Sequence, residues 1–131
     1  MPSFHDSAEA EAPPEEVWKL LYDPARFPDW WAGIATVELG EEGSYTMYPE
    51  GYPDFPMAQV LDTGGDGQTV TVSCLVNDLR FEWRLEALAG GVSTRILVEV
   101  EIPESEAARL ASQRETIRAS LSSLVALAGE A

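Results

Sequence analysis

The segment from residue 12 to residue 31, APPEEVWKLLYDPARFPDWW, constrains the fold of this chain more than any other part of it. Pro13 and Pro14 lack backbone N–H groups, a loss that the first turn of a helix tolerates. An Asp-Pro pair at residues 23 and 24 then repeats the start signal for a second short helix, which Gly33 can end. Two short helices closed by a pair of tryptophans favour a helical support at one end of a sheet over a catalytic loop.

Seven segments have the composition or the alternation of strands. Period two is clearest in three consecutive runs, residues 69–76, 80–87 and 92–102, with turn residues between them. This pattern predicts an antiparallel meander with one covered face and one wet face. Four further strands are expected at residues 4–12, 34–39, 44–48 and 57–62, a loop or bulged edge at the proline-rich residues 49–56, and a hairpin turn at residues 64–67.

The C-terminal segment predicts one long helix over residues 104–128, with acidic residues in its first turn and Gly129 placed to end it. A helix of about 25 residues spans about 37 Å, which is enough to cross a whole sheet. Its apolar residues fall on one stripe, which can cover the apolar face of the meander: Leu110, Ile117, Leu121, Leu124 and Ala128.

Arg114 falls inside that stripe. A guanidinium on a covered face costs free energy unless it is paired or wet. Three placements are therefore open for Arg114: it reaches past the sheet edge into solvent, it pairs with Asp6 of the first strand, or it faces a polar ligand group in a cavity. The last placement predicts a ligand with an apolar body and one acidic or carbonyl end.

Composition excludes several classes of partner. The length of 131 residues predicts one domain over residues 1–131. The net charge of −15 repels phosphate backbones and anionic lipid headgroups, so we expect this domain to bind no nucleic acid. No apolar stretch approaches the roughly 20 residues that span a bilayer, so membrane insertion is not expected. A single cysteine and no evident secretory signal favour a cytoplasmic protein.

No catalytic or metal-binding constellation is visible in the sequence. His5 is the one histidine, near the terminus on the polar side of its strand, so no Ser-His-Asp or Cys-His arrangement can be assembled. Cys74 lies on the apolar side of its strand, as expected of a buried structural thiol. Zinc needs about four ligands, and the acidic residues are spread over exposed positions, so neither a metal nor a cofactor is expected.

The order of strand, two short helices, six strands and long helix resembles the START-like (SRPBCC) superfamily, whose members have the helix-grip fold. The polyketide cyclase/dehydrase-like branch looks most similar. The resemblance covers essentially the whole chain, and four segments carry it: residues 12–18, 23–30, 79–85 and 90–95. These segments are specific for the fold in this order and are not specific for an activity.

The resemblance implies an α+β fold in which a curved seven-stranded antiparallel sheet wraps around the long helix. It also implies an apolar cavity between them that binds a small hydrophobic molecule, such as a lipid, a quinone or a polyketide-like compound. The ligand-binding residues expected there are Trp30, Trp31, Tyr45, Met47, Phe81, Trp83, Arg114, Ile117 and Leu121. The loop at residues 49–56, flanked by Tyr48, is a candidate lid.

Two other functions stay open from the sequence. One is an enzyme of the aromatase/cyclase type, in which Arg114, Tyr45 and Asp6 could polarise a carbonyl group. The other is a protein-interaction module with a filled core. A ligand-binding protein should have a closed cavity of roughly 300 Å³ or more with few polar groups. A cyclase should bring two or more polar groups to one point. Whatever its function, the chain is expected to be a monomer or a homodimer.

Overall fold

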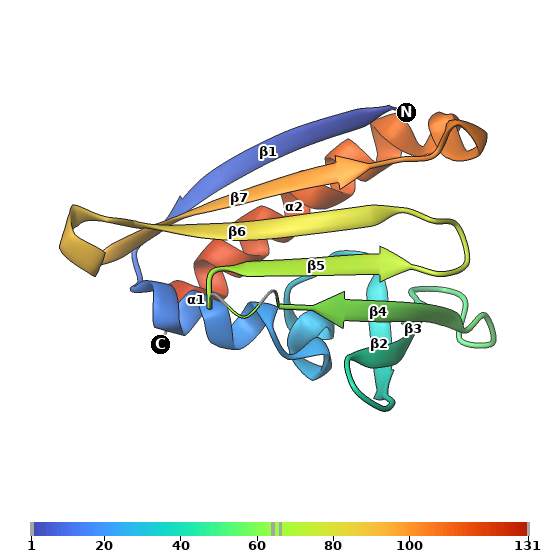
Figure 1. Ribbon diagram of the computed structural model, residues 1–131, viewed down its shortest axis with the longest axis horizontal. Coiled ribbons are helices and arrows are strands. Elements are labelled where there is room, and N and C mark those ends of the chain that lie inside the picture. Colours follow the sequence, from blue (N-terminus) through green and yellow to red (C-terminus); the bar gives the residue numbers. More distant parts are fainter. Residues whose placement is uncertain (1, 64, 66, 131) are drawn as a thin grey trace.

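The computed structural model describes residues 2–63, 65 and 67–130 and has two layers (Figure 1). One layer is a seven-stranded antiparallel sheet of order β1-β7-β6-β5-β4-β3-β2. The other contains the C-terminal helix, which crosses one face of the sheet (Figure 1). The strands are β1 (Ser3–Ala10), β2 (Ile34–Leu39), β3 (Ser44–Pro49), β4 (Met57–Asp62), β5 (Thr69–Cys74), β6 (Arg80–Leu88) and β7 (Ser93–Glu101).

All seven expected strands are confirmed, and their alternation sets which side chains face the helix. In β6 the side chains of Phe81, Trp83 and Leu85 are buried, whereas those between them are partly or fully exposed. Trp83 pairs with Val98 of β7, whose side chain lies on the same buried face. Residues 64 and 66 of the expected hairpin turn lie outside the described part of the chain.

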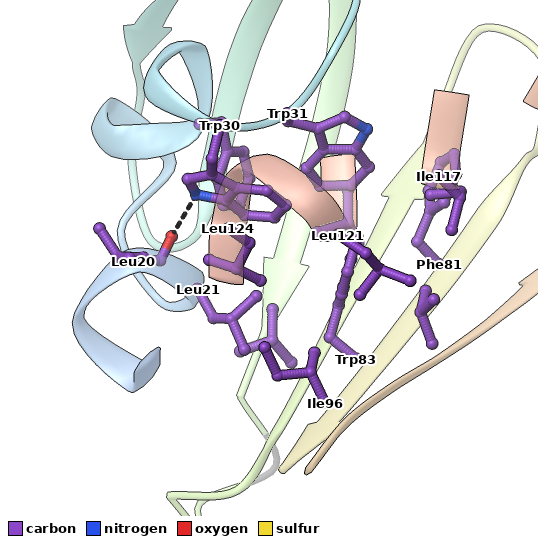
Figure 2. Packing of buried hydrophobic residues seen from close by; sticks show 14 of the residues in the cluster. Leu20, Leu21, Trp30, Trp31, Phe81, Trp83, Ile96, Ile117, Leu121 and Leu124 are labelled. Carbon is purple, nitrogen blue, oxygen red and sulfur yellow. Dashed lines mark hydrogen bonds between the residues drawn. The ribbon is translucent and has the colours of Figure 1, made fainter. Parts of the chain in front are cut away.

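The two short helices follow β1 as expected. Helix α1 (Pro14–Leu21) begins directly after Pro13 and buries Val17, Leu20 and Leu21. The second is the 3₁₀ helix η1 (Pro24–Asp29), whose first turn is capped by the Asp23 side chain. The Trp30 indole N–H donates a hydrogen bond of 2.9 Å to the Leu20 carbonyl oxygen, so the tryptophan pair is attached to the end of α1 (Figure 2).

The C-terminal helix is shorter than the sequence predicts. Residues 104–109 form a separate 3₁₀ helix, η3 (Glu104–Arg109), with a non-helical backbone at Glu106, and α2 (Leu110–Gly129) begins only after it. None of the six η3 side chains is buried. A further one-turn helix, η2 (Ala89–Gly91), joins β6 to β7.

Of the three placements left open for Arg114, the structure shows the first, past the sheet edge and in solvent. Ile117, Leu121, Leu124 and Ala128 are buried as predicted, but Arg114 is exposed. Its guanidinium carbon lies 5.4 Å from the centre of the Phe4 ring at the β1 edge, a cation–π contact that leaves the charge in solvent. Asp6 is paired one turn further along α2, by the Nε of Arg118 at 3.2 Å.

None of the described helices is both long and apolar enough to cross a lipid bilayer.

Candidate ligand-binding pocket

Large aromatic side chains fill the middle of the space between α2 and the sheet. The rings of Trp30 and Trp31 stack at 5.4 Å, and each lies edge-to-face with Trp83, at 5.1 and 5.3 Å (Figure 2). Phe27 packs against both members of the tryptophan pair. Under the C-terminal half of α2 the two layers are therefore joined by a solid aromatic core.

A pocket of about 200 Å³ remains beside this aromatic core. It lies between strands β3, β4 and β5 on one side and the junction of η3 with α2 on the other, and it opens partly to solvent. Apolar side chains form most of its wall: Trp31, Ile34, Met47, Met57, Leu79 and Phe81. The closed cavity of roughly 300 Å³ expected from the sequence is absent from the described residues, because the tryptophans occupy the rest of the hollow.

The floor of the pocket is a row of three polar side chains on adjacent strands. Tyr45 of β3 pairs with Gln59 of β4, and Gln59 pairs with Cys74 of β5. Side chains of directly paired residues on one face lie about 5 Å apart. All three are at least nine-tenths buried and line the pocket.

Neither Tyr45 nor Gln59 has a side-chain hydrogen bond to any described residue. Among the described residues, the indole nitrogen of Trp83 is the one polar side-chain atom that is both sealed from solvent and without a hydrogen-bond partner. The polar atoms of Tyr45 and Gln59 are therefore accessible to solvent. Tyr45 and Gln59 therefore direct their polar atoms into the pocket.

Burial raises the pKa of the Tyr45 hydroxyl well above its ordinary value of 10.0, and the charge interaction with neighbouring Cys74 raises that pKa further. Tyr45 is therefore protonated at neutral pH, when it can donate a hydrogen bond and cannot act as a base. Its ring is held by an edge contact with Phe27 at 5.7 Å.

Charge is almost absent from the pocket. Among the described residues that line it, Arg109 is the one charged side chain. It lies at the mouth, where its Nε makes an ion pair of 3.0 Å with Glu106. Gln113 and Thr116 of α2 and Asn77 of the β5–β6 turn are uncharged. No carboxylate or histidine therefore faces the pocket among the described residues.

The nine residues expected from the sequence to bind a ligand lie in three places. Trp31, Tyr45, Met47 and Phe81 line the pocket. Four others are packed in the buried core around it: Trp30, Trp83, Ile117 and Leu121. Arg114 lies outside both, at a surface hollow with Phe4, Asp6 and Arg118. Tyr52 and Phe55 of the candidate lid are exposed and do not line the pocket.

Gln59 is the polar pocket residue that the sequence analysis missed. It stands between Met57 and Leu61 on the buried side of β4, where an apolar residue is expected. A polar residue at an apolar position was a usable signal. Gln113 and Thr116 of α2 were also missed; each stands four residues before a buried residue of the helix, Ile117 or Ser120, and so on the covered side.

The sequence model of the family described as "Polyketide cyclase / dehydrase and lipid transport" matches residues 1–129. The chain belongs to this family. It is a START-like (SRPBCC) protein of the polyketide cyclase/dehydrase branch, with the helix-grip fold that the sequence predicts. A search of curated proteins gives no match.

Solved structures with the same fold span nearly the whole of this polyketide cyclase/dehydrase family member. The Zhui aromatase/cyclase from Streptomyces sp. R1128 has a TM-score of 0.81 at 17% identity, covering 97% of this chain and 93% of that chain. Protein XoxI from Bacillus cereus gives 0.77 at 18%, with 95% and 94% covered. A START superfamily protein from Mycobacterium smegmatis gives 0.71 at 13%, with 94% and 96% covered. At these identities the likeness is one of fold.

Proposed function

We propose that this protein binds a small, mostly apolar molecule in the pocket between strands β3–β5 and the start of α2. The observation that carries the proposal is the pocket floor, where the buried side chains of Tyr45 and Gln59 have no partner among the described residues. Two polar groups without a protein partner, directed into one apolar-walled pocket, are available to a ligand that displaces water from it. The family's description, which includes lipid transport, supports a ligand-binding role.

The pocket volume limits the size of the ligand. A cavity of about 150 Å³ holds benzene, whereas sites for drug-sized ligands begin near 300 Å³. A pocket of about 200 Å³ thus suits one substituted ring or a short chain. In this conformation it is too small for a multi-ring polyketide or a whole lipid.

Tyr45 and Gln59 meet at the pocket floor, which is the convergence of polar groups expected of a cyclase. Binding is favoured over cyclase chemistry because no base accompanies them among the described residues. A cyclisation that begins with proton removal needs a base within hydrogen-bond reach of the ligand. No carboxylate or histidine of the described chain lines the pocket, and the raised pKa of Tyr45 keeps that hydroxyl protonated. An interaction module is expected to have a completely filled core. Here the aromatic core fills only part of the space between α2 and the sheet, because the pocket occupies the rest.

The test is to block the pocket from the helix side. Thr116 lines the pocket, so Thr116→Trp should occupy its volume and abolish binding of acetophenone, a one-ring ketone, measured by isothermal titration calorimetry. Ala119→Trp is the matched control, because Ala119 lies one turn along on the exposed side of α2. Equal binding by the two variants, or no binding by the unmodified protein, would contradict the proposal.

A further inference from the structure

We infer that the buried end of the pocket selects uncharged ligands through a hydrogen-bond acceptor, a carbonyl oxygen above all. The inference rests on the proposed function and adds the chemical class of the ligand. It follows from the kinds of polar group on the pocket wall, from the absence of charge at its floor, and from the side chains that enclose the remaining space.

All three unpartnered groups can donate a hydrogen bond, whereas only Tyr45 and Gln59 can also accept one. The Trp31 indole N–H can only donate, and the protonated Tyr45 hydroxyl and the Gln59 NH₂ can both donate. Trp31 is 6% exposed, Tyr45 3% and Gln59 5%, and none of the three has a side-chain hydrogen bond to a described residue. Figure 2 shows the Trp31 ring nitrogen on the side turned away from Trp30. A ligand that brings an acceptor satisfies these donors.

Among the described residues, no positively or negatively charged side chain lies at the pocket floor. Tyr45, Gln59 and Cys74 are the floor residues, and Arg109 at the mouth is already paired with Glu106. A carboxylate placed at the floor would lose its hydration without meeting a cation, which weakens its binding. The net charge of −15 opposes anions further. A neutral carbonyl loses far less hydration and is matched by the donors.

The walls fit a flat apolar body attached to that carbonyl. The Trp31 and Phe81 rings meet edge-to-face at 5.1 Å and form one side. Met47 and Met57, which are paired across β3 and β4, form another. Aromatic faces and thioethers pack well against a ring. An aryl ketone therefore satisfies the walls and the floor together.

The experiment compares three one-ring probes: acetophenone, its hydrocarbon analogue ethylbenzene, and the anion benzoate. Dissociation constants come from ¹H–¹⁵N NMR titrations of the unmodified protein and of Tyr45→Phe and Gln59→Leu. Each variant should weaken acetophenone about 3- to 10-fold, the net value of one neutral hydrogen bond, and leave ethylbenzene within about 2-fold. Benzoate should bind at least about 10-fold more weakly than acetophenone.

Tyr48→Phe is the matched control, because Tyr48 lies on the same strand and does not line the pocket. Tyr48→Phe should leave the dissociation constants of acetophenone and ethylbenzene unchanged. Tyr45→Phe is expected to fold, since the hydroxyl that it removes has no hydrogen bond to a described residue.

The outcomes separate the inference from the proposed function. If the ratio of the acetophenone to the ethylbenzene dissociation constant is the same in the unmodified protein and in both variants, acceptor selection is overturned. The pocket then remains a binding site. Benzoate bound more tightly than acetophenone would overturn the preference for neutral ligands. If none of the probes binds, the proposed function fails with the inference.

Discussion

At the scale of single residues, the neighbours of each side chain decide whether it stabilises the core or faces a ligand. Trp83 and Tyr45 point to the same face of one sheet, and both are buried. Trp83 is enclosed by two other tryptophans, whereas the Tyr45 hydroxyl reaches the pocket. Alternation within a strand predicts that both are buried and cannot distinguish these two roles, because a gap in packing depends on residues far apart in the chain.

Trp83→Ala should lower the free energy of unfolding by about 3–5 kcal/mol, because it opens a cavity in the aromatic core that rigid neighbours cannot fill. Chemical denaturation monitored by circular dichroism measures the loss. Val92→Ala is the control: the side chain of Val92 is 71% exposed, so this change should stay within about 0.5 kcal/mol. A loss below about 1 kcal/mol at Trp83 would contradict its place in the core.

Tyr45 should make the protein less stable at high pH. Its pKa is raised in the folded state, so above pH 10 the unfolded chain releases this proton while the folded protein keeps it. The free energy of unfolding then falls with a slope of up to about 1.4 kcal/mol per pH unit from this group alone, and the term is absent below pH 10.

The slope belongs to Tyr45 if Tyr45→Phe removes it. Denaturation curves at pH 9 and pH 11 should show a smaller drop for the variant than for the unmodified protein. Identical drops would mean that the hydroxyl ionises in the folded state as readily as in water, and that it is not enclosed as the structure has it.

At the scale of elements, the middle of α2 is tied to the segment between η1 and β2. Ser120 is fully buried, and its hydroxyl joins two segments distant in sequence: it donates to the Thr116 carbonyl oxygen at 2.7 Å and accepts from the Ala32 N–H at 2.9 Å. Ala32 lies in the segment between η1 and β2, at the pocket wall. This contact fixes the middle of α2 next to the tryptophan pair.

Ser120→Ala should destabilise the protein by about 1–3 kcal/mol, since it leaves the part-buried Ala32 N–H without its acceptor. Thermal or urea unfolding measures the change. Ser123→Ala, at an exposed position of the same helix, should change stability by less than about 0.5 kcal/mol. An equally small change at Ser120 would show that the contact between α2 and the η1–β2 segment contributes little.

The elements also show how far the sequence alone could lead. Strand alternation and the proline start signals predicted every strand and both short helices, because these patterns are local. The start of α2 was predicted six residues too early, since nothing local distinguishes a 3₁₀ turn beyond the sheet from the first turn of a helix. The placement of Arg114 stayed open because a helical period places it on the stripe, while the cost of desolvating its charge turns it to solvent.

At the scale of the whole molecule, the fold provides a hollow and the side chains divide it. The tryptophan pair, which the sequence predicts as an end support, extends into the hollow and fills its middle (Figure 2). What remains is about 200 Å³ at the end where α2 begins. The helix-grip architecture was recognisable from the order of elements, but the size of this pocket depends on how six aromatic side chains pack together and could not be predicted from the sequence.

The central claim is that the remaining pocket, and no other hollow on the surface, is the binding site. Acetophenone added to ¹⁵N-labelled protein tests it directly through the side-chain N–H signals. The claim predicts shifts of the Trp31 indole and of the Gln59 and Gln113 amides, with the Trp18 indole and the Arg118 guanidinium unchanged. Shifts at Arg118 and Arg114, with none at Trp31 and Gln59, would contradict it.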